Sequence, residues 1–160
     1  MWPDSKVVNP TPRHLAIVRG EPARYEPSAI VRPRNDLSDR QVHMICDVIR
    51  ETGFSIHQYF GPGFRERVYE RSLTHRLRKC GLDVRVQPRV KVLDHDGTEL
   101  TEEVLDLIVE EVLVLELKAI RQTTDTDIAQ ILGYLRATEF RHGLLINFGS
   151  PKFFIKKYVY

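Results

Sequence analysis

The apolar positions in the first half of the chain repeat with the period of an α-helix. After Ser38 they recur every three or four residues, at Val42, Ile45, Val48, Ile49 and Ile56. Ser38 followed by Gln41 is a capping-box pattern, which marks a helix start. The pattern predicts a helix over about 39–59, ended by "GPG" at 61–63, and a second helix over about 64–79.

The apolar period changes after Leu82 to the alternation of a β-strand. Apolar and polar residues alternate over 84–93, interrupted by Pro88, and "DHDG" at 94–97 is a turn signal. The rest of the pattern predicts two strands, a helix and two strands, over about 99–109, 112–119, 126–138, 143–148 and 152–159. The predicted order, ααβββαββ, indicates an α/β or α+β domain built around a mixed central sheet flanked by helices.

The first 37 residues lack any such period. Residues 1–37 hold six of the nine prolines and five scattered arginines, Arg13, Arg19, Arg24, Arg32 and Arg34. We interpret them as an extended or disordered arm and place a single domain at 38–160. No apolar run approaches the roughly 20 residues that span a bilayer, and the first residues lack the apolar core of a secretory signal. The two cysteines give no disulfide framework, so we expect a cytoplasmic protein with no membrane segment.

Charge is distributed unevenly although the net charge is only +2. Residues 61–90 carry eight Lys/Arg against three acids, and residues 117–160 carry seven against three. Between them, residues 91–116 carry one lysine and nine acids. An acidic block between two basic ones is what a metal site beside a polyanion-binding surface requires, while solvated surface charge is the ordinary alternative.

The segment "LVLELKAI" at 113–120 places two charged residues in a buried strand. Glu116 and Lys118 are two residues apart, so they share one face, about 7 Å apart at Cα, while the leucines beside them point the other way. Asp106 lies opposite Glu116 if a three-residue loop or a bulge falls near Glu110–Glu111. Two carboxylates and a lysine suit a hard divalent cation that acidifies a water; the alternative is a structural ion pair.

Two predicted helices supply further candidates. Glu66 lies in the middle of the apolar stripe of the second helix, where it either joins the acids or stabilises the helix N-terminus. In the third helix, Gln130 and Tyr134 are four residues apart on one face. Gln130 can bind a phosphate, a carboxylate or a metal-bound water, whereas Tyr134 alone is typical of ordinary packing.

These motifs resemble those of the GxxExxY proteins, which belong to the PD-(D/E)XK nuclease superfamily. The naming pattern is matched by Gly63, Glu66 and Tyr69, and the resemblance extends over roughly 37–160. It implies a restriction-endonuclease-like core in which Asp106 is the motif's aspartate and Glu116 and Lys118 are its E-x-K. It also implies that Gln130 and Tyr134 form a Q-x-x-x-Y element, that Glu66 is an additional acid, and that the backbone carbonyl of Leu117 binds metal.

The resemblance therefore implies a nuclease that uses Mg²⁺ or Mn²⁺ and acts on nucleic acid, most simply DNA. The alternative is a catalytically silent nuclease fold that binds nucleic acid or a protein partner. Phe64 and Val68 lie opposite the Glu66 stripe and are free to form an interface, so a homo-oligomer also stays open.

Overall fold

The computed structural model describes residues 31–160. Most of the arm predicted over 1–37 therefore lies outside the described residues, including Arg13, Arg19 and Arg24. Residues 31–37 form no helix or strand. They nevertheless contact the domain, because Val31 is buried and the backbone amide of Arg34 donates to the Glu111 carbonyl at 2.6 Å.

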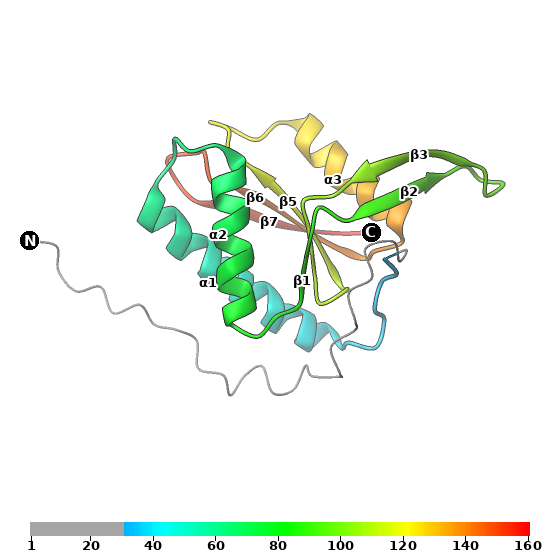
Figure 1. The fold of residues 1–160 in the computed structure, drawn as a ribbon, viewed down its shortest axis with the longest axis horizontal. Helices are drawn as coiled ribbons and strands as arrows, with labels where there is room; N and C mark the ends of the chain where they lie inside the picture. Colours follow the sequence, from blue (N-terminus) through cyan, green and yellow to red (C-terminus); the bar gives the residue numbers. More distant parts are fainter. Residues whose placement is uncertain (1–30) are drawn as a thin grey trace, which may run out of the picture.

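The described residues form three helices and seven strands (Figure 1). The helices are α1 (Asp39–Phe60), α2 (Glu66–Lys79) and α3 (Asp125–Thr138). The strands are β1 (Val84–Val86), β2 (Arg89–Leu93), β3 (Glu99–Val104), β4 (Leu107–Val109), β5 (Leu113–Lys118), β6 (His142–Asn147) and β7 (Phe154–Val159). None of the helices within residues 31–160 is long and apolar enough to cross a membrane.

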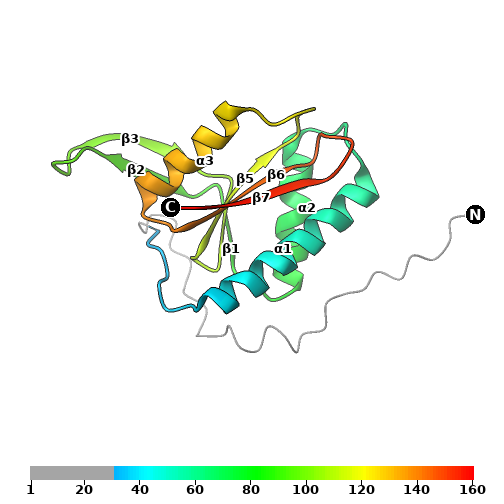
Figure 2. The ribbon, with the colours of Figure 1, turned by 180° about the vertical axis from the view of Figure 1, so that it is seen from behind.

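The predicted order is confirmed with one correction: two of the predicted strands are each divided in two. The chain leaves the main sheet at Pro88, which has no N–H to donate to a ladder, and it returns at Asp106. The outgoing and the returning segments lie side by side. Gln87 N–H donates to the Asp106 carbonyl at 2.8 Å, and Leu105 N–H donates to the Pro88 carbonyl at 3.1 Å. Between them β2 and β3 form a separate ribbon that projects from the domain (Figures 1 and 2).

The main sheet has the strand order β1-β4-β5-β6-β7, with β5 and β6 parallel and the other pairs antiparallel. One face packs against α1 and α2 in a cluster that includes Leu113, Leu115 and Leu117, as the sequence predicts. Val114 points to the other face and packs with Leu135 of α3. The sheet is therefore buried on both faces, and side chains at the end of β5 are shielded from water.

The capping box predicted at Ser38 is confirmed: its hydroxyl accepts from Gln41 N–H, and the Gln41 side chain accepts from Ser38 N–H. Phe64 is 49% exposed, and its ring contacts Phe60 and Tyr69 edge-on.

Candidate active site

The hairpin of β4 and β5 has the register that brings Asp106 opposite Glu116. Leu107 pairs with Leu115 and Val109 with Leu113, so the same register extended by one residue aligns Asp106 with Glu116. The connection is a three-residue loop, residues 110–112, which is one of the two alternatives that the sequence left open. Its first two residues, both glutamates, have positive φ angles of 54°, which the tight reversal requires.

A hydrogen bond fixes the Asp106 carboxylate against the end of β5. Its Oδ2 accepts from the backbone N–H of Leu117 at 2.7 Å, where β4 has ended and leaves that edge without a ladder partner. Because the N–H and C=O of a strand residue point to the same side, the Leu117 carbonyl lies on the Asp106 side of β5 as well.

Lys118 connects the acids to α3. Its Nζ donates to Glu116 Oε1 at 2.7 Å and to Gln130 Oε1 at 2.9 Å, and it lies 3.7 Å from Asp127 Oδ1. Gln130 Nε2 in turn donates to the Tyr134 hydroxyl at 2.8 Å. The two α3 residues that the sequence singles out therefore hold the lysine in place, one directly and one through its neighbour.

Glu66 is the first residue of α2 and approaches the same group of acids from the α2 side of the sheet. Burial raises the pKa of Glu66 and the charge of Asp106 raises it further, while Lys118 and a backbone hydrogen bond from Ala119 lower it. Tyr69 secures this helix start, because its hydroxyl donates to the Gly61 carbonyl at 2.6 Å and its ring stacks on Phe148. The glycine-rich loop and the tyrosine thus position Glu66.

The charge of Asp106 raises the pKa values of both Glu116 and Glu66, and Glu66 also raises that of Glu116. Burial and then the charge of Asp106 raise the pKa of Glu116 from 4.5 to about 7, against the opposing effect of Lys118. Burial also raises the pKa of Asp106. Ionised carboxylates here repel each other and are poorly solvated. A cation bound among them would offset both the repulsion and the loss of hydration.

The donor set fits a hard divalent cation by its chemistry. Asp106 and Glu116 each use one carboxylate oxygen in a hydrogen bond, and the second oxygen of each accepts none from residues 31–160. Oxygen donors of this kind suit Mg²⁺ or Mn²⁺. Across residues 31–160, no three His, Cys, Asp or Glu side chains already stand close enough together to hold an ion. The acids therefore do not form a closed cage among themselves.

Two charged residues of this region were missed by the sequence reasoning. Glu70 is buried, accepts from Gln87 Nε2 at 3.2 Å, and raises the pKa values of Asp106 and Glu66. Its position four residues after Glu66, on the same side of the helix, was the available signal. Asp127 faces Lys118, but in the sequence it reads as part of the capping box with Thr124 that starts α3.

Comparison with known protein families gives one match. The family model described as the PD-(D/E)XK nuclease superfamily matches residues 43–158, from within the first turn or so of α1 to nearly the end of β7. No curated protein and no solved structure shows significant similarity to the chain.

Proposed function

Because the chain belongs to the PD-(D/E)XK nuclease superfamily, we propose that it is a divalent-metal-dependent nuclease that hydrolyses phosphodiester bonds of DNA. One observation carries the proposal: at the end of β5 the carboxyl groups of Asp106 and Glu116 lie opposite each other, and the partly buried Lys118 donates to Glu116 at 2.7 Å. Glu66 approaches the same acids from α2. Within the superfamily we assign the chain to the GxxExxY proteins, through Gly63, Glu66 and Tyr69.

Glu66, Asp106, Glu116 and the carbonyl of Leu117 are the groups that would hold Mg²⁺ or Mn²⁺. A divalent ion supplies two things when bound: it lowers the pKa of a water, and it neutralises charge that develops on the phosphate. In hydrolysis the water oxygen forms a new P–O bond while the ester P–O bond breaks. One proton leaves the water and one is taken up by the departing oxygen, both exchanged with solvent.

Lys118 acts through its charge. Burial lowers the pKa of its ammonium, but the hydrogen bond with Glu116 and the nearby carboxylates outweigh this, so its pKa lies above the ordinary value. A lysine that stays protonated cannot accept the water's proton. Two of its three N–H groups donate to Glu116 and Gln130, which leaves one for the water or for a phosphate oxygen. Gln130 and Tyr134 keep its Nζ in place for this task.

The test is cleavage of single- and double-stranded DNA with Mn²⁺ by wild type, Glu116→Ala and Lys118→Ala. Removing a group that stabilises the transition state typically lowers the rate by about a hundredfold or more, and we expect that loss in both variants. Lys91→Ala in the ribbon is the matched control and should retain wild-type activity. Equal activity in wild type, Glu116→Ala and Lys118→Ala would overturn the catalytic assignment.

A further inference from the structure

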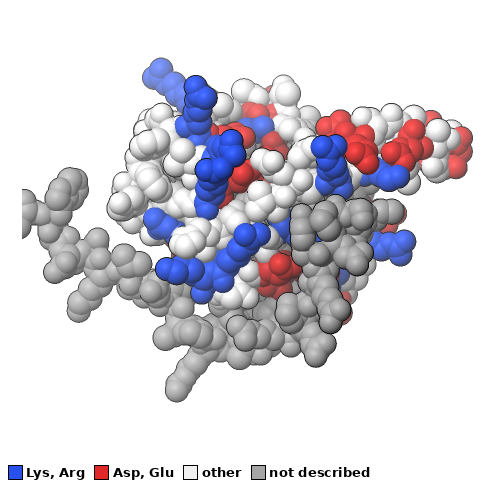
Figure 3. Space-filling model, viewed as in Figure 1, with Lys and Arg blue, Asp and Glu red and all other residues white. Residues whose placement is uncertain are grey.

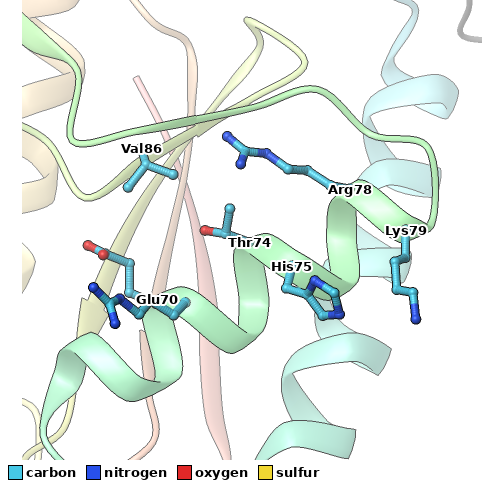
Figure 4. Close-up of a pocket in the computed structure, with 7 residues that line it drawn as sticks. Glu70, Thr74, His75, Arg78, Lys79 and Val86 are labelled. Atoms are coloured by element: carbon cyan, nitrogen blue, oxygen red, sulfur yellow. The ribbon is translucent and has the colours of Figure 1, made fainter.

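A hollow of about 530 Å³ lies beside the candidate active site, between α2 and β1 (Figure 4). It is lined by Val86 of β1 and by six residues of α2, Glu70, Arg71, Thr74, His75, Arg78 and Lys79. One end adjoins the acids, because Val86 pairs with Leu107, the residue after Asp106. The volume lies within the range of about 300–1,000 Å³ typical of ligand sites.

The rim of the hollow is positively charged. Its cations, Arg71, Arg78 and Lys79, are all exposed, and in the described part of the chain none of them lies within 4.0 Å of a carboxylate oxygen. Figure 3 shows Lys and Arg side chains gathered over α2 on this face. Arg78 is held by a hydrogen bond to the Val84 carbonyl at 2.7 Å. Cations without a carboxylate partner are suited to phosphate oxygens.

The interior of the hollow differs from its rim. Val86 contributes an apolar wall and is 37% exposed, although it is a large hydrophobic residue. The Thr74 hydroxyl is buried and has no hydrogen-bond partner among residues 31–160, and Thr74 itself is only 6% exposed. Figure 4 shows Thr74 and Arg78 on the side of α2 that faces Val86, with the Glu70 carboxylate at one end. An apolar wall with a few polar groups suits a flat heterocycle better than a lone phosphate.

We propose that this hollow binds one unpaired nucleotide of the substrate strand, next to the phosphate that reacts. The base lies against Val86 and Thr74, and the rim cations bind its phosphate. This rests on the proposed function, because the hollow adjoins the acids assigned to phosphodiester hydrolysis. A base held in a duplex must first unpair to enter, so the enzyme should favour single strands or unpaired ends.

The experiment measures binding without cleavage, with the full chain in EDTA and fluorescent 12-nucleotide DNA. Three probes are compared: a single strand, the blunt duplex of the same sequence, and an abasic single strand. Wild type should bind the single strand about tenfold or more tighter than the duplex and the abasic strand. Equal affinity for all three probes would overturn the proposal.

Two variants separate the phosphate and base contacts. Arg71→Gln should reduce the slope of log affinity against log salt by about 0.7 on the single strand, the value of one phosphate contact. Arg141→Gln is the control, because this exposed arginine precedes β6, three strands from β1 in the sheet, and it should leave the slope unchanged. Equal slopes in the two variants would contradict the phosphate assignment.

Thr74→Val removes the hydroxyl and keeps the shape. Since the hydroxyl has no protein partner, the variant should fold at least as stably as wild type. It should weaken binding of the normal strand about three- to tenfold and leave the abasic strand unaffected. Unchanged binding of both strands would overturn the base assignment.

Competition by a free mononucleotide tests whether the hollow binds a nucleotide of the substrate strand or a separate small molecule. The mononucleotide should compete with the labelled strand only weakly, and competition as strong as that of the unlabelled strand would make the hollow an effector site instead. The assignment of the hollow as a nucleotide site and the proposed nuclease function can be refuted independently. If Arg71→Gln and Thr74→Val bind DNA like wild type while Mn²⁺-dependent cleavage is present, only the nucleotide site is refuted. If both variants weaken binding as expected but no Mn²⁺-dependent cleavage is found, only the nuclease function is refuted.

Discussion

Two Lys–Glu pairs of almost the same length lie in opposite environments. In the projecting ribbon, Lys91 Nζ is 2.6 Å from Glu99 Oε2, and the two side chains are 43% and 45% exposed. At the end of β5, Lys118 Nζ is 2.7 Å from Glu116 Oε1, and the side chains are 16% and 4% exposed. The geometry of the contact is therefore the same, while the access of water differs.

The difference shows what marks a site in this protein. Water and salt screen the ribbon pair, and such pairs contribute little to stability. The buried pair has a second acid, Asp106, beside it and a third, Glu66, nearby, so that Glu116 has a pKa of about 7 in spite of its lysine. The excess of acid over base in a buried place, and not the ion pair itself, distinguishes the candidate site.

The largest expected effect on stability is that of removing the partly buried lysine, Lys118. Lys118→Met leaves Glu116 buried without its partner, and in EDTA at pH 8 we expect a loss of about 3 kcal/mol in the free energy of unfolding. Lys91→Met, the matched change in the ribbon, should leave that free energy unchanged within error. Urea denaturation measures the free energy of unfolding of both variants. Equal losses in the two would contradict the distinction between the two ion pairs.

The pH dependence of stability should carry the signature of Glu116. In the metal-free folded protein this carboxyl keeps its proton to about pH 7, whereas in the unfolded chain it ionises near 4.5. The folded state therefore binds more protons between these values, and the free energy of unfolding falls as pH rises across that window. We expect a fall on the order of 3 kcal/mol relative to Glu116→Gln, measured by urea denaturation in EDTA. Parallel pH profiles for the two proteins would contradict the assigned environment of Glu116.

Tyr134→Phe should have a moderate effect. The change removes the hydroxyl that accepts from Gln130 Nε2, and losing one such hydrogen bond costs about 1 kcal/mol. The thermal midpoint and the cleavage rate should both fall, because Gln130 then holds Lys118 less firmly. Tyr160→Phe at the exposed C-terminus is the control, and an equal response in the two variants would show that Tyr134 has no positioning role.

The smallest effect is that of salt. Raising NaCl from about 0.05 M to about 1 M shortens the screening length from roughly 14 Å to 3 Å. Any small difference in unfolding free energy between wild type and Glu99→Gln should then vanish. The loss in Lys118→Met should persist, because burial protects that pair from screening. A loss in Lys118→Met that salt abolishes would place the pair at the surface.

Much of the fold was predictable because its signals are local. The capping box at Ser38 and the apolar stripes predicted the helices to within a few residues, and alternation in the strands predicted which leucines of β5 face the core. Parity allowed the register of Asp106 against Glu116, but the sequence could not choose between a loop and a bulge, and the structure has the three-residue loop. The division of two strands was missed, because it depends on where the chain leaves one sheet for another, which Pro88 signals only weakly.

The candidate site was predictable in its members more than in their contacts. Gln130 and Tyr134 were selected by spacing, but the sequence could not tell that Gln130 binds Lys118. Glu70 was missed because its role depends on the distance from α2 to β4, which is set by tertiary packing. Local patterns specify which side chains share a face; the packing of elements decides which faces meet.

The most direct test of the central claim is a calorimetric titration of the metal-free protein with Mn²⁺. If the buried acids form a metal site, wild type should bind one or two ions, and the binding should disappear in Asp106→Asn, which keeps the shape and removes the charge. No binding to wild type, or the same binding in both proteins, would contradict the account. The acids would then be structural, and the chain would be a nuclease fold that binds nucleic acid or a partner without cutting.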